Sequence, residues 1–414
     1  MFPYSLPLTH CRADLPPCYN PPVHPDRSTT AHPALLARAR RLHDEAILVD
    51  AHCDTTQRIA TGQWDFRRRH DDGHVDLPRL REGGVSALFL AIWAGRSDGG
   101  IKPVDAARRQ LAALRSLIDS LGDSLCLATT AQEVRYAKSG GKIAVLLGLE
   151  GGHLIDDSLD VLREFHRSGA CYLTLTHSFH TSWADSAGIH EPLAPRHGGL
   201  TPFGREVIAE LNRLGMMVDV SHVSDDTFWQ VVECSAAPIV ATHSSCRSVA
   251  PHRRNLSDDM LRAIARTGGV AHVNFGAAFL DPHHPPLDAA ALEAYTRLGG
   301  VFPPNVTSHV TPFSWLLDHF DHALQVVGPD HVGIGSDFDG VPTLPRGMSD
   351  CASFPNLTAG LLERGYSDSD VRKVLGENTL RVLEACQRIG TSRHTPHSTD
   401  SAARLSGNRR TDGA

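Results

Sequence analysis

Short apolar runs alternate with amphipathic stretches over most of the chain. Eight runs rich in Val, Ile and Leu are bounded by turn residues and lack strict polar alternation, which is typical of strands buried on both faces. These runs are Ile47–Asp54, Val85–Trp93, Ile143–Glu150, Ala170–His177, Met216–His222, Pro238–His243, Gly269–Phe275 and Val332–Asp337. We expect each run to form a β-strand.

The segments between these runs have the signals of helices. Apolar residues recur at helical spacing over Val104–Leu121 and Phe203–Leu214, and the second stretch ends at Gly215 as at a C-cap. Ser224 and Ser257 each precede two aspartates, an order that is typical of a helix start. Strands that alternate with helices in this way predict a (β/α)8 barrel of parallel strands.

A doubly wound sheet is the competing architecture. It would normally show a Gly-rich phosphate-binding turn after its first strand. The first predicted strand ends instead in the sequence DAHCD. The barrel is therefore the favoured fold.

The length of the chain fits one barrel with extensions. The chain has 414 residues, and a barrel of this kind takes about 250 or more. Residues 1–32 are rich in proline and polar residues without hydrophobic periodicity, so we expect a disordered arm there. Residues 391–414 are expected to form a disordered tail. Residues 33–390 then form a single (β/α)8 domain.

Composition excludes several classes of partner and site. A net charge of −7 favours neither nucleic acid nor an acidic membrane surface. The absence of an 18-residue apolar run excludes a transmembrane helix, and the N-terminus does not resemble a signal peptide, so we expect a cytoplasmic protein without a membrane anchor. The nine cysteines form no Cys-x-x-Cys pair, which argues against a thiolate zinc site.

The 25 histidines raise the question of a metal site, but they also make chance pairs more frequent. The positions of the histidines along the predicted strands must therefore distinguish a metal site from chance pairs. Barrel enzymes carry their active sites at the C-terminal ends of the strands. Six of the eight predicted strands end in residues that bind metals or transfer protons, which scattered histidines would not do; these residues are His52, Asp54, Glu150, His177, His222, His243 and Asp337.

Each of these residues also has a simpler structural interpretation. His52 and Asp54 point the same way on a strand and could form part of a zinc site. In an isolated His-x-Asp motif, however, the histidine is more often a buried residue that is hydrogen-bonded to a neighbour. Glu150 ends a wholly apolar strand, where a carboxylate is costly unless it is paired or bound to metal. Its two oxygens could bridge two ions. His222 and His243 end consecutive predicted strands, so they would lie side by side.

The aspartate after the last strand suits a general base. Asp337 lies between Gly335 and Gly340, in a segment that predicts a tight turn. The simpler interpretation is a turn-forming aspartate, which is what we expect of Asp339. His153 and His180 are expected to line the pocket without binding metal. The polar-loop histidines are expected to be solvated; these are His70, His74, His283 and His284.

Taken together, eight segments resemble the membrane (renal) dipeptidase family, peptidase family M19, a branch of the amidohydrolase-like barrels. The segments are VDAHCDT, GLEGG, LTLTHSFHTSWADS, LTPFGREVIAELNRLGMMVDVSH, ATHSSCRSV, HRRNLSDDMLRAIA, HVGIGSDFDG and VLGENTL. The resemblance covers residues 37 to 388. The resemblance implies a homodimeric zinc dipeptidase that hydrolyses free dipeptides. Dipeptides with a D-residue at the C-terminal position are further candidate substrates.

The resemblance also implies a role for each site residue. Two Zn²⁺ ions would be bound, the first by His52, Asp54 and Glu150, and the second by Glu150, His222 and His243. His177 would polarise the scissile carbonyl, and Asp337 would be the catalytic acid and base. Arg254 would bind the terminal carboxylate of the substrate, with Arg253 as the nearest alternative.

Physical chemistry agrees with these roles. Two zinc ions that share a water lower its pKa and supply the hydroxide that attacks the peptide carbonyl. Zinc and His177 would stabilise the oxyanion, while Asp337 would carry the proton to the leaving amine. An arginine fork suits a free carboxylate, which limits substrates to those that end one residue past the cut.

Two departures and two alternatives accompany this hypothesis. Many relatives have glutamine and two aromatics in the strand that here reads ALFLAIW, and an aromatic where this chain has Gly276, so the side-chain preference stays open. A deaminase or deacylase on the same barrel is disfavoured by His-x-Asp in place of His-x-His. A non-enzymatic metal-binding protein is disfavoured by the presence of Asp337 and His177. Metal titration with an activity assay would separate these cases.

Overall fold

A computed structural model describes residues 33–96, 100–189, 192–286 and 308–392 of the chain. Eight parallel strands form a nearly closed barrel in the order β1-β2-β4-β5-β6-β7-β8-β9. Their bounds are β1 Val49–Cys53, β2 Ala87–Ile92, β4 Ile143–Glu150, β5 Ala170–Thr174, β6 Met217–Asp219, β7 Ile239–Ala241, β8 Val270–Val273 and β9 Val332–Ile334. All eight predicted strands are confirmed, and the fold is the (β/α)8 barrel that their order predicts.

A ninth strand was not predicted. It is β3 (Leu125–Leu127), which pairs with the first residues of β4 below the point where β5 joins that strand. Three residues are too few to show a period, so the apolar pattern gave no signal for it.

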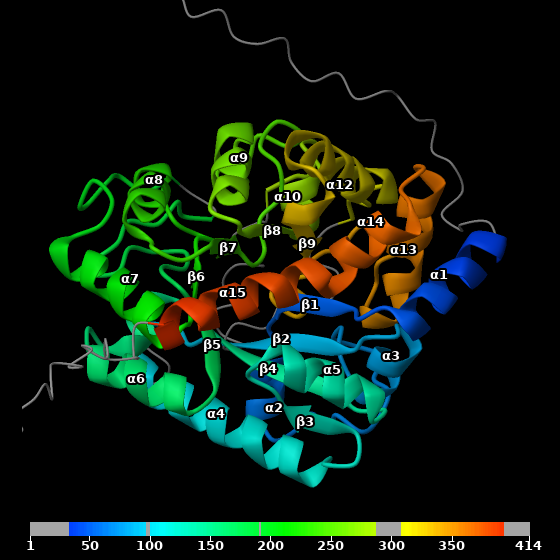
Figure 1. Ribbon diagram of the computed structural model, residues 1–414, viewed down its shortest axis with the longest axis horizontal. Helices are drawn as coiled ribbons and strands as arrows, with labels where there is room; N and C mark the ends of the chain where they lie inside the picture. The colour runs from blue at the N-terminus through cyan, green and yellow to red at the C-terminus, as the bar shows by residue number, and fades with distance from the viewer. Residues whose placement is uncertain (1–32, 97–99, 190–191, 287–307, 393–414) are drawn as a thin grey trace, which may run out of the picture.

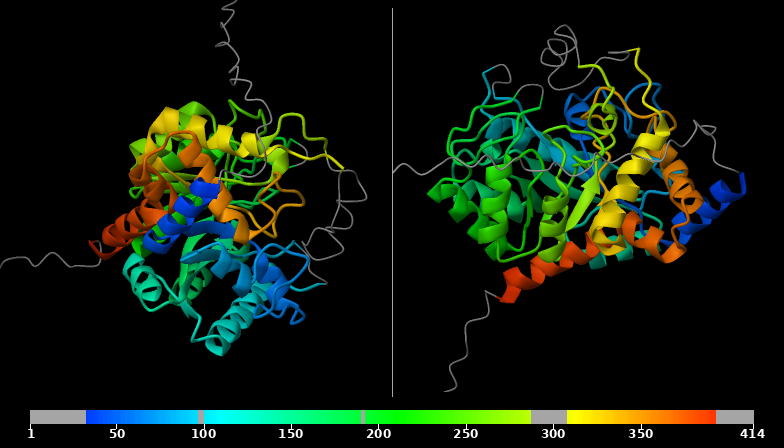
Figure 2. Two further views of the ribbon diagram at one scale, coloured as in Figure 1. Left: turned by 90° about the vertical axis from the view of Figure 1, so that its right-hand side faces the viewer. Right: turned by 90° about the horizontal axis from the view of Figure 1, so that it is seen from above.

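Helices surround the barrel, as the two turned views show (Figure 2). The larger ones are α1 Pro33–Glu45, α4 Pro103–Ser120, α5 Ala131–Ser139, α6 Leu159–Arg167, α7 Pro202–Leu214, α8 Asp225–Cys234, α9 Asp258–Arg266, α12 Phe313–Val327, α13 Phe354–Glu363 and α15 Asn378–Ser392. Shorter ones are α2 Thr55–Ala60, α3 Leu77–Glu82, α10 Ala277–Leu280, α14 Asp368–Arg372, the 3₁₀ helices η1 Gly152–Ile155, η2 Pro329–His331 and η3 Cys351–Ser353, and the π-helical segment η4 Lys373–Glu377.

The predicted helix signals are confirmed. Ser224 and Ser257 accept hydrogen bonds from the backbone three residues on, as N-caps of α8 and α9. Gly215 ends α7 in the left-handed conformation at φ 73°. The predicted arm and most of the predicted tail lie outside the described residues, but Thr391 and Ser392 continue α15 rather than beginning a tail.

Apolar residues fill the barrel from its N-terminal end. Early strand residues such as Val49, Ala144 and Val240 pack with Leu380 and Leu383 of α15, the helix that crosses in front of the strands in Figure 1. A larger apolar cluster lies between the strands and the outer helices. The C-terminal ends of the strands are thereby left for polar side chains.

The barrel closes at the end where those polar side chains lie. Cys53 of β1 bridges Phe338, just beyond β9. The Asp54 amide donates to the Phe338 carbonyl over 2.8 Å, and the Asp337 amide donates to the His52 carbonyl over 3.0 Å. Closure therefore brings the first and last strand ends together.

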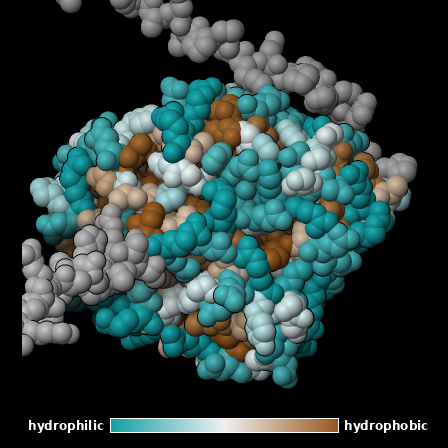
Figure 3. All heavy atoms as spheres, viewed as in Figure 1, coloured by the Kyte–Doolittle hydropathy of each residue, from teal (hydrophilic) through white to brown (hydrophobic). Residues whose placement is uncertain are grey.

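The outer surface has few large apolar groups. The face in Figure 3 is mainly hydrophilic, with apolar residues in small separate groups. Within the described ranges, no helix combines the length and the apolarity that crossing a bilayer requires.

Candidate active site

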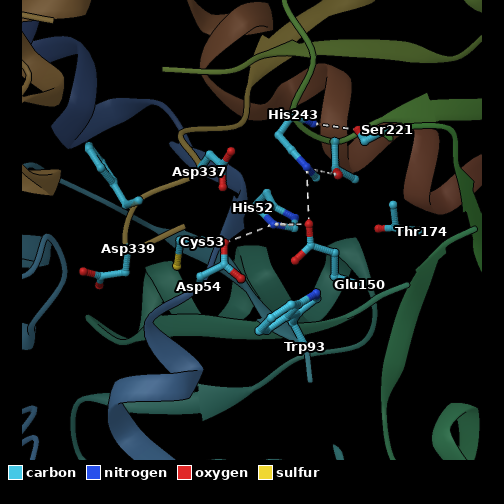
Figure 4. A network of polar contacts seen from close by, with 12 residues as sticks. His52, Cys53, Asp54, Trp93, Glu150, Thr174, Ser221, His243, Asp337 and Asp339 are labelled. Atoms are coloured by element: carbon cyan, nitrogen blue, oxygen red, sulfur yellow. Dashed lines mark hydrogen bonds and ion pairs between the residues drawn. The ribbon is translucent and has the colours of Figure 1, made fainter. Parts of the chain in front are cut away.

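The barrel mouth gathers all seven strand-end residues predicted from the sequence. Figure 4 shows the side chains of His52, His243 and Glu150 converging, with Asp54 and Asp337 close by. All seven are buried. They come from strand ends far apart in the sequence, so the closed barrel is what brings them together.

Glu150 lies at the centre of the cluster. Its Oε1 is 3.0 Å from Nε2 of His222 and 3.5 Å from Nε2 of both His52 and His243. Nε2 of His177 is 3.6 Å from the same oxygen. Four imidazole nitrogens thus face one carboxylate oxygen.

The side chains form three overlapping groups that could each hold a metal ion. They are His52–Glu150–His243, Glu150–His177–His222 and His52–Asp54–Asp337, and the ligand atoms within each group all lie within 4.8 Å of one another. The five predicted ligands therefore belong to one cluster, in which His177 and Asp337 also lie at distances typical of ligands.

The donor set fits a metal ion. The buried Nε2 of His52 has no hydrogen-bond partner among the described residues, although it lies 3.4 Å from Oδ2 of Asp54. Nε2 of His222 is 2.8 Å from Nε2 of His243, so at most one of these nitrogens can carry a proton between them. Imidazole nitrogens and carboxylate oxygens are ligands that zinc prefers.

The pKa values show where charge is concentrated. Burial lowers the pKa of His222 and of His243 well below the usual range, so both remain neutral, as metal ligands must be. Burial opposes the charged form of His52 too, but Glu150 and Asp54 raise its pKa well above the usual range. These carboxylates attract a proton or a metal cation to the same place.

Asp337 is held in a strained turn. Its φ is 60°, which few residues other than glycine adopt. Burial and the neighbouring Asp54 raise its pKa to about 6. Asn274, just after β8, donates from Nδ2 to Asp337 Oδ2 over 2.7 Å and accepts from the Gly276 amide over 2.6 Å. One carboxylate oxygen is thus anchored.

A glycine makes room for the two aspartates. A Cβ atom at Gly340 would lie 2.1 Å from Oδ2 of Asp54 and 2.3 Å from Oδ1 of Asp337. Both contacts are far shorter than van der Waals distance, so any side chain there would displace the carboxylates.

Asp339 is the turn residue that was predicted, with φ 65°. It also accepts hydrogen bonds from Thr55 Oγ1 (2.6 Å), Arg58 Nε (3.0 Å) and the His74 amide (3.0 Å). The prediction that His74 is solvated is wrong, since its ring is mostly buried and its Nδ1 lies 2.8 Å from the Asp339 amide. This network attaches the loop after β9 to α2.

Arg254 is a buried cation at the edge of the cluster. It lies on the loop after β7 and is 4% exposed, whereas Arg253 is only partly buried. Its Nη2 donates to the His243 carbonyl over 3.2 Å, and its Nε has no partner. Within the described part of the chain, no carboxylate lies within ion-pair distance of Arg254. A buried cation without a counter-ion is suited to an anionic ligand.

Aromatic side chains border His177. The centroid of the Trp93 ring is 5.0 Å from that of the His177 ring. The centroid of the Phe179 ring is 6.4 Å from it. His153, predicted to line the pocket, packs against Phe179 at 4.8 Å and binds the Ala94 carbonyl instead of the Glu150 cluster.

Sequence reasoning missed the residues that support the cluster from within the barrel. The Tyr172 hydroxyl lies 2.8 Å from His52 Nδ1, and Gly148 leaves room for its ring, since a Cβ there would lie 2.0 Å from Tyr172. Asn274 could have been found, because it follows a predicted strand as the other site residues do. Tyr172 and Asp219 lie inside the predicted runs Ala170–His177 and Met216–His222 rather than at their ends, so they gave no such signal.

Comparisons with known proteins agree with this geometry. A family model described as membrane dipeptidase (peptidase family M19) matches residues 36–397. The chain is 34% identical over 372 residues to dipeptidase verJ of Clonostachys rogersoniana, with 86% of this chain and 88% of the relative covered.

Two solved structures are similar over nearly their whole length. The probable dipeptidase PvdM of Pseudomonas aeruginosa has a TM-score of 0.76 at 27% identity, covering 86% of this chain and 100% of that one. A metallopeptidase of Rhodobacter sphaeroides, liganded with a phosphinate mimic of L-Ala-D-Ala, has a TM-score of 0.71 at 29% identity, covering 82% of this chain and 99% of that one.

Proposed function

The chain belongs to the membrane dipeptidase family, peptidase family M19, and is a metallo-dipeptidase; from that premise we propose that it cuts free dipeptides with two zinc ions. The proposed ligands are His52, Asp54 and Glu150 for one ion and Glu150, His222 and His243 for the other. The observation that carries the proposal is the convergence of four imidazole Nε2 atoms on Glu150 Oε1 at 3.0–3.6 Å.

Zinc, when bound here, supplies a water of lowered pKa and a Lewis acid for the peptide carbonyl. Glu150 would be shared by the two ions, because histidines of both proposed sites face it. Burial of the ligands excludes bulk water and strengthens these electrostatic contacts.

His177 and Asp337 perform the proton and charge chemistry in this proposal. His177 lies against Trp93 beside the cluster, where its imidazole can donate a hydrogen bond to the oxygen that becomes negative. Asp337 has Oδ2 anchored by Asn274, which leaves Oδ1 to accept the proton of the attacking water. The same carboxylate can then give that proton to the leaving amine.

Arg254 limits the length of the substrate. Its unpartnered Nε and its burial favour binding of the free C-terminal carboxylate of a dipeptide. A longer peptide would place an uncharged amide there, so the proposal predicts strong preference for dipeptides over tripeptides.

We extend the proposal to dipeptides with a D-residue at the C-terminal position and to a homodimeric assembly. The support for the first is the Rhodobacter sphaeroides relative, whose ligand mimics L-Ala-D-Ala. The support for the second is the family resemblance. Light scattering would measure the mass of the assembly, and a monomer would refute the second extension.

A substrate panel tests the proposed function. We expect hydrolysis of L-Ala-L-Ala and L-Ala-D-Ala by zinc-loaded protein, no turnover after chelation, and recovery when zinc is restored. N-acylated amino acids and aminopurines, the substrates of a deacylase and a deaminase, should stay intact. Turnover of either of those with inert dipeptides would overturn the proposal.

A further inference from the structure

A buried aspartate that is not among the predicted ligands lies directly behind the histidine cluster. Asp219 is the last residue of β6 and has no exposed surface. Its Oδ1 accepts from the amides of Ser221 (3.0 Å) and Thr242 (2.9 Å). Its Oδ2 accepts from the hydroxyls of Thr174 (2.6 Å) and Thr242 (2.6 Å). Four donors thus converge on the two oxygens of this carboxylate.

The direction of the hydrogen bonds fixes the state of His243. Thr242 has one hydroxyl proton, and that proton is donated to Asp219, because a carboxylate can only accept. Oγ1 of Thr242 also lies 2.9 Å from Nδ1 of His243. The hydroxyl oxygen can only accept there, so the proton must lie on Nδ1 of the imidazole. Nε2 then carries no proton, and it lies 2.8 Å from Nε2 of His222 and 3.5 Å from Glu150 Oε1.

We propose that Asp219 is a positioning residue that acts through Thr242 to hold His243 in the tautomer with a bare Nε2. The inference rests on the proposed function, since it takes His243 as a zinc ligand. Ligand histidines commonly donate their second N–H to an acceptor that fixes the ring and its tautomer. Here a threonine hydroxyl is that acceptor, and the carboxylate behind it sets its direction.

The other two histidines proposed as zinc ligands lack this arrangement. Nδ1 of His222 has no hydrogen-bond partner in the described part of the chain. Nδ1 of His52 meets the Tyr172 hydroxyl, which can donate or accept and so fixes no direction by itself. The directional relay from Asp219 is therefore specific to His243.

Asp219→Asn reverses the relay with almost no change in volume. The amide oxygen keeps the two backbone donors, and the amide nitrogen then faces the threonine hydroxyls as a donor. Thr242 must accept from that nitrogen, which frees its proton for Nδ1 of His243. We expect the Nε2–H tautomer to be favoured and the affinity for one of the two zinc ions to fall about 10- to 100-fold.

The threonines supply matched controls. Thr242→Val removes the hydroxyl and should weaken zinc binding similarly, whereas Thr242→Ser keeps the hydroxyl and should retain it. Thr174→Val removes the other hydroxyl from the same Asp219 oxygen, yet no hydrogen bond joins Thr174 to His243 in the described structure. It should leave zinc affinity within about threefold of wild type, below the 10-fold lower limit for loss of such a contact.

Two measurements test the inference. Competition with a chromophoric chelator gives both zinc affinities of folded variants, and thermal unfolding checks the fold. The ¹⁵N shifts of His243 in metal-free protein report the tautomer directly. We expect Nδ1–H in wild type and in Thr242→Ser, and a shift towards Nε2–H in Asp219→Asn.

Three results would overturn the inference. They are Nε2–H in the wild-type protein, wild-type zinc affinity in both Asp219→Asn and Thr242→Val, and equal weakening by Thr174→Val. If Asp219→Asn does not fold, the Thr242 valine and serine variants decide. The tautomer measurement needs no zinc, so it tests the inference separately from the proposed function. If the proposed function is wrong, the wild-type protein will not bind two zinc ions, whatever the tautomer of His243.

Discussion

Replacing Arg254 with alanine removes the only group that we assign to the substrate carboxylate. Arg254 is 4% exposed, its Nε has no partner, its Nη2 donates to a backbone carbonyl, and its Nη1 lies 3.4 Å from the Ser244 hydroxyl. Burial lowers its pKa to about 10, so it stays charged at neutral pH. A bound carboxylate would be its counter-ion within a site that excludes water.

The structure sets the size of the expected effect. Removing one partner of a buried, hydrogen-bonded charge pair costs about 2–5 kcal/mol. At about 1.36 kcal/mol for each factor of ten, kcat/KM for a free dipeptide should fall about 30- to 5000-fold. An amidated dipeptide offers only a neutral carbonyl, whose hydrogen bond contributes about 0.5–1.5 kcal/mol, so its loss should be about tenfold or less.

The assay compares kcat/KM of both substrates in wild type, Arg254→Ala and Arg253→Ala. Arg253 is the matched control, because it is the adjacent residue with the same side chain and lies only partly buried. Equal losses for the free and the amidated dipeptide would refute the contact. If Arg253→Ala shows the selective loss for the free dipeptide instead, the assignment of the carboxylate contact to Arg254 is wrong.

Three further predictions test other parts of the account. Asp337→Asn should keep both metals but lose about 10²- to 10⁴-fold in turnover, by steady-state kinetics and metal analysis, and near-normal turnover would remove Asp337 from the mechanism. Gly340→Ala should fold but bind metal poorly, because the added Cβ would overlap the carboxylates of Asp54 and Asp337. In the control Gly122→Ala the atom nearest to the added Cβ is 3.6 Å away, so this variant should bind metal normally. Equal metal content in the two variants would contradict the prediction. Burial lowers the pKa of His319 from 6.5 to about 4, so the unfolded chain takes up this proton at a higher pH than the folded protein does. The free energy of unfolding should therefore fall by about 3 kcal/mol as pH falls from about 6.5 to 4. In urea unfolding, His319→Gln should show a weaker pH dependence of this free energy over that range, and an unchanged pH dependence would count against the prediction.

The sequence predicted the barrel because its strands are continuous apolar runs. All eight runs became strands. β4 has the bounds of its predicted run, whereas the other seven strands are shorter than theirs; β9, for instance, ends at Ile334 while the predicted run continued to Asp337. The residues of this run beyond Ile334 begin the loop at the barrel mouth. A three-residue strand such as β3 carries too little pattern to be found.

The site was predictable where its residues end strands, since barrel topology alone brings those ends together. The supporting contacts were not predictable in this way. Tyr172 reaches His52 across the barrel interior, and Asp219 reaches Thr242, the first residue after the neighbouring strand β7. Such contacts depend on register and on space left by residues such as Gly148, which one sequence does not reveal. The buried environment of His74 depends equally on Asp339, far along the chain.

The central claim is a two-metal site organised around Glu150, and a zinc titration of metal-free protein tests it most directly. Dipeptide hydrolysis and bound zinc would be followed in the same samples as zinc is added. The account predicts that activity rises until two equivalents are bound per chain, and that Glu150→Gln binds both ions weakly because histidines of both sites face this carboxylate. Full activity with one equivalent, or unchanged zinc binding in Glu150→Gln, would contradict it.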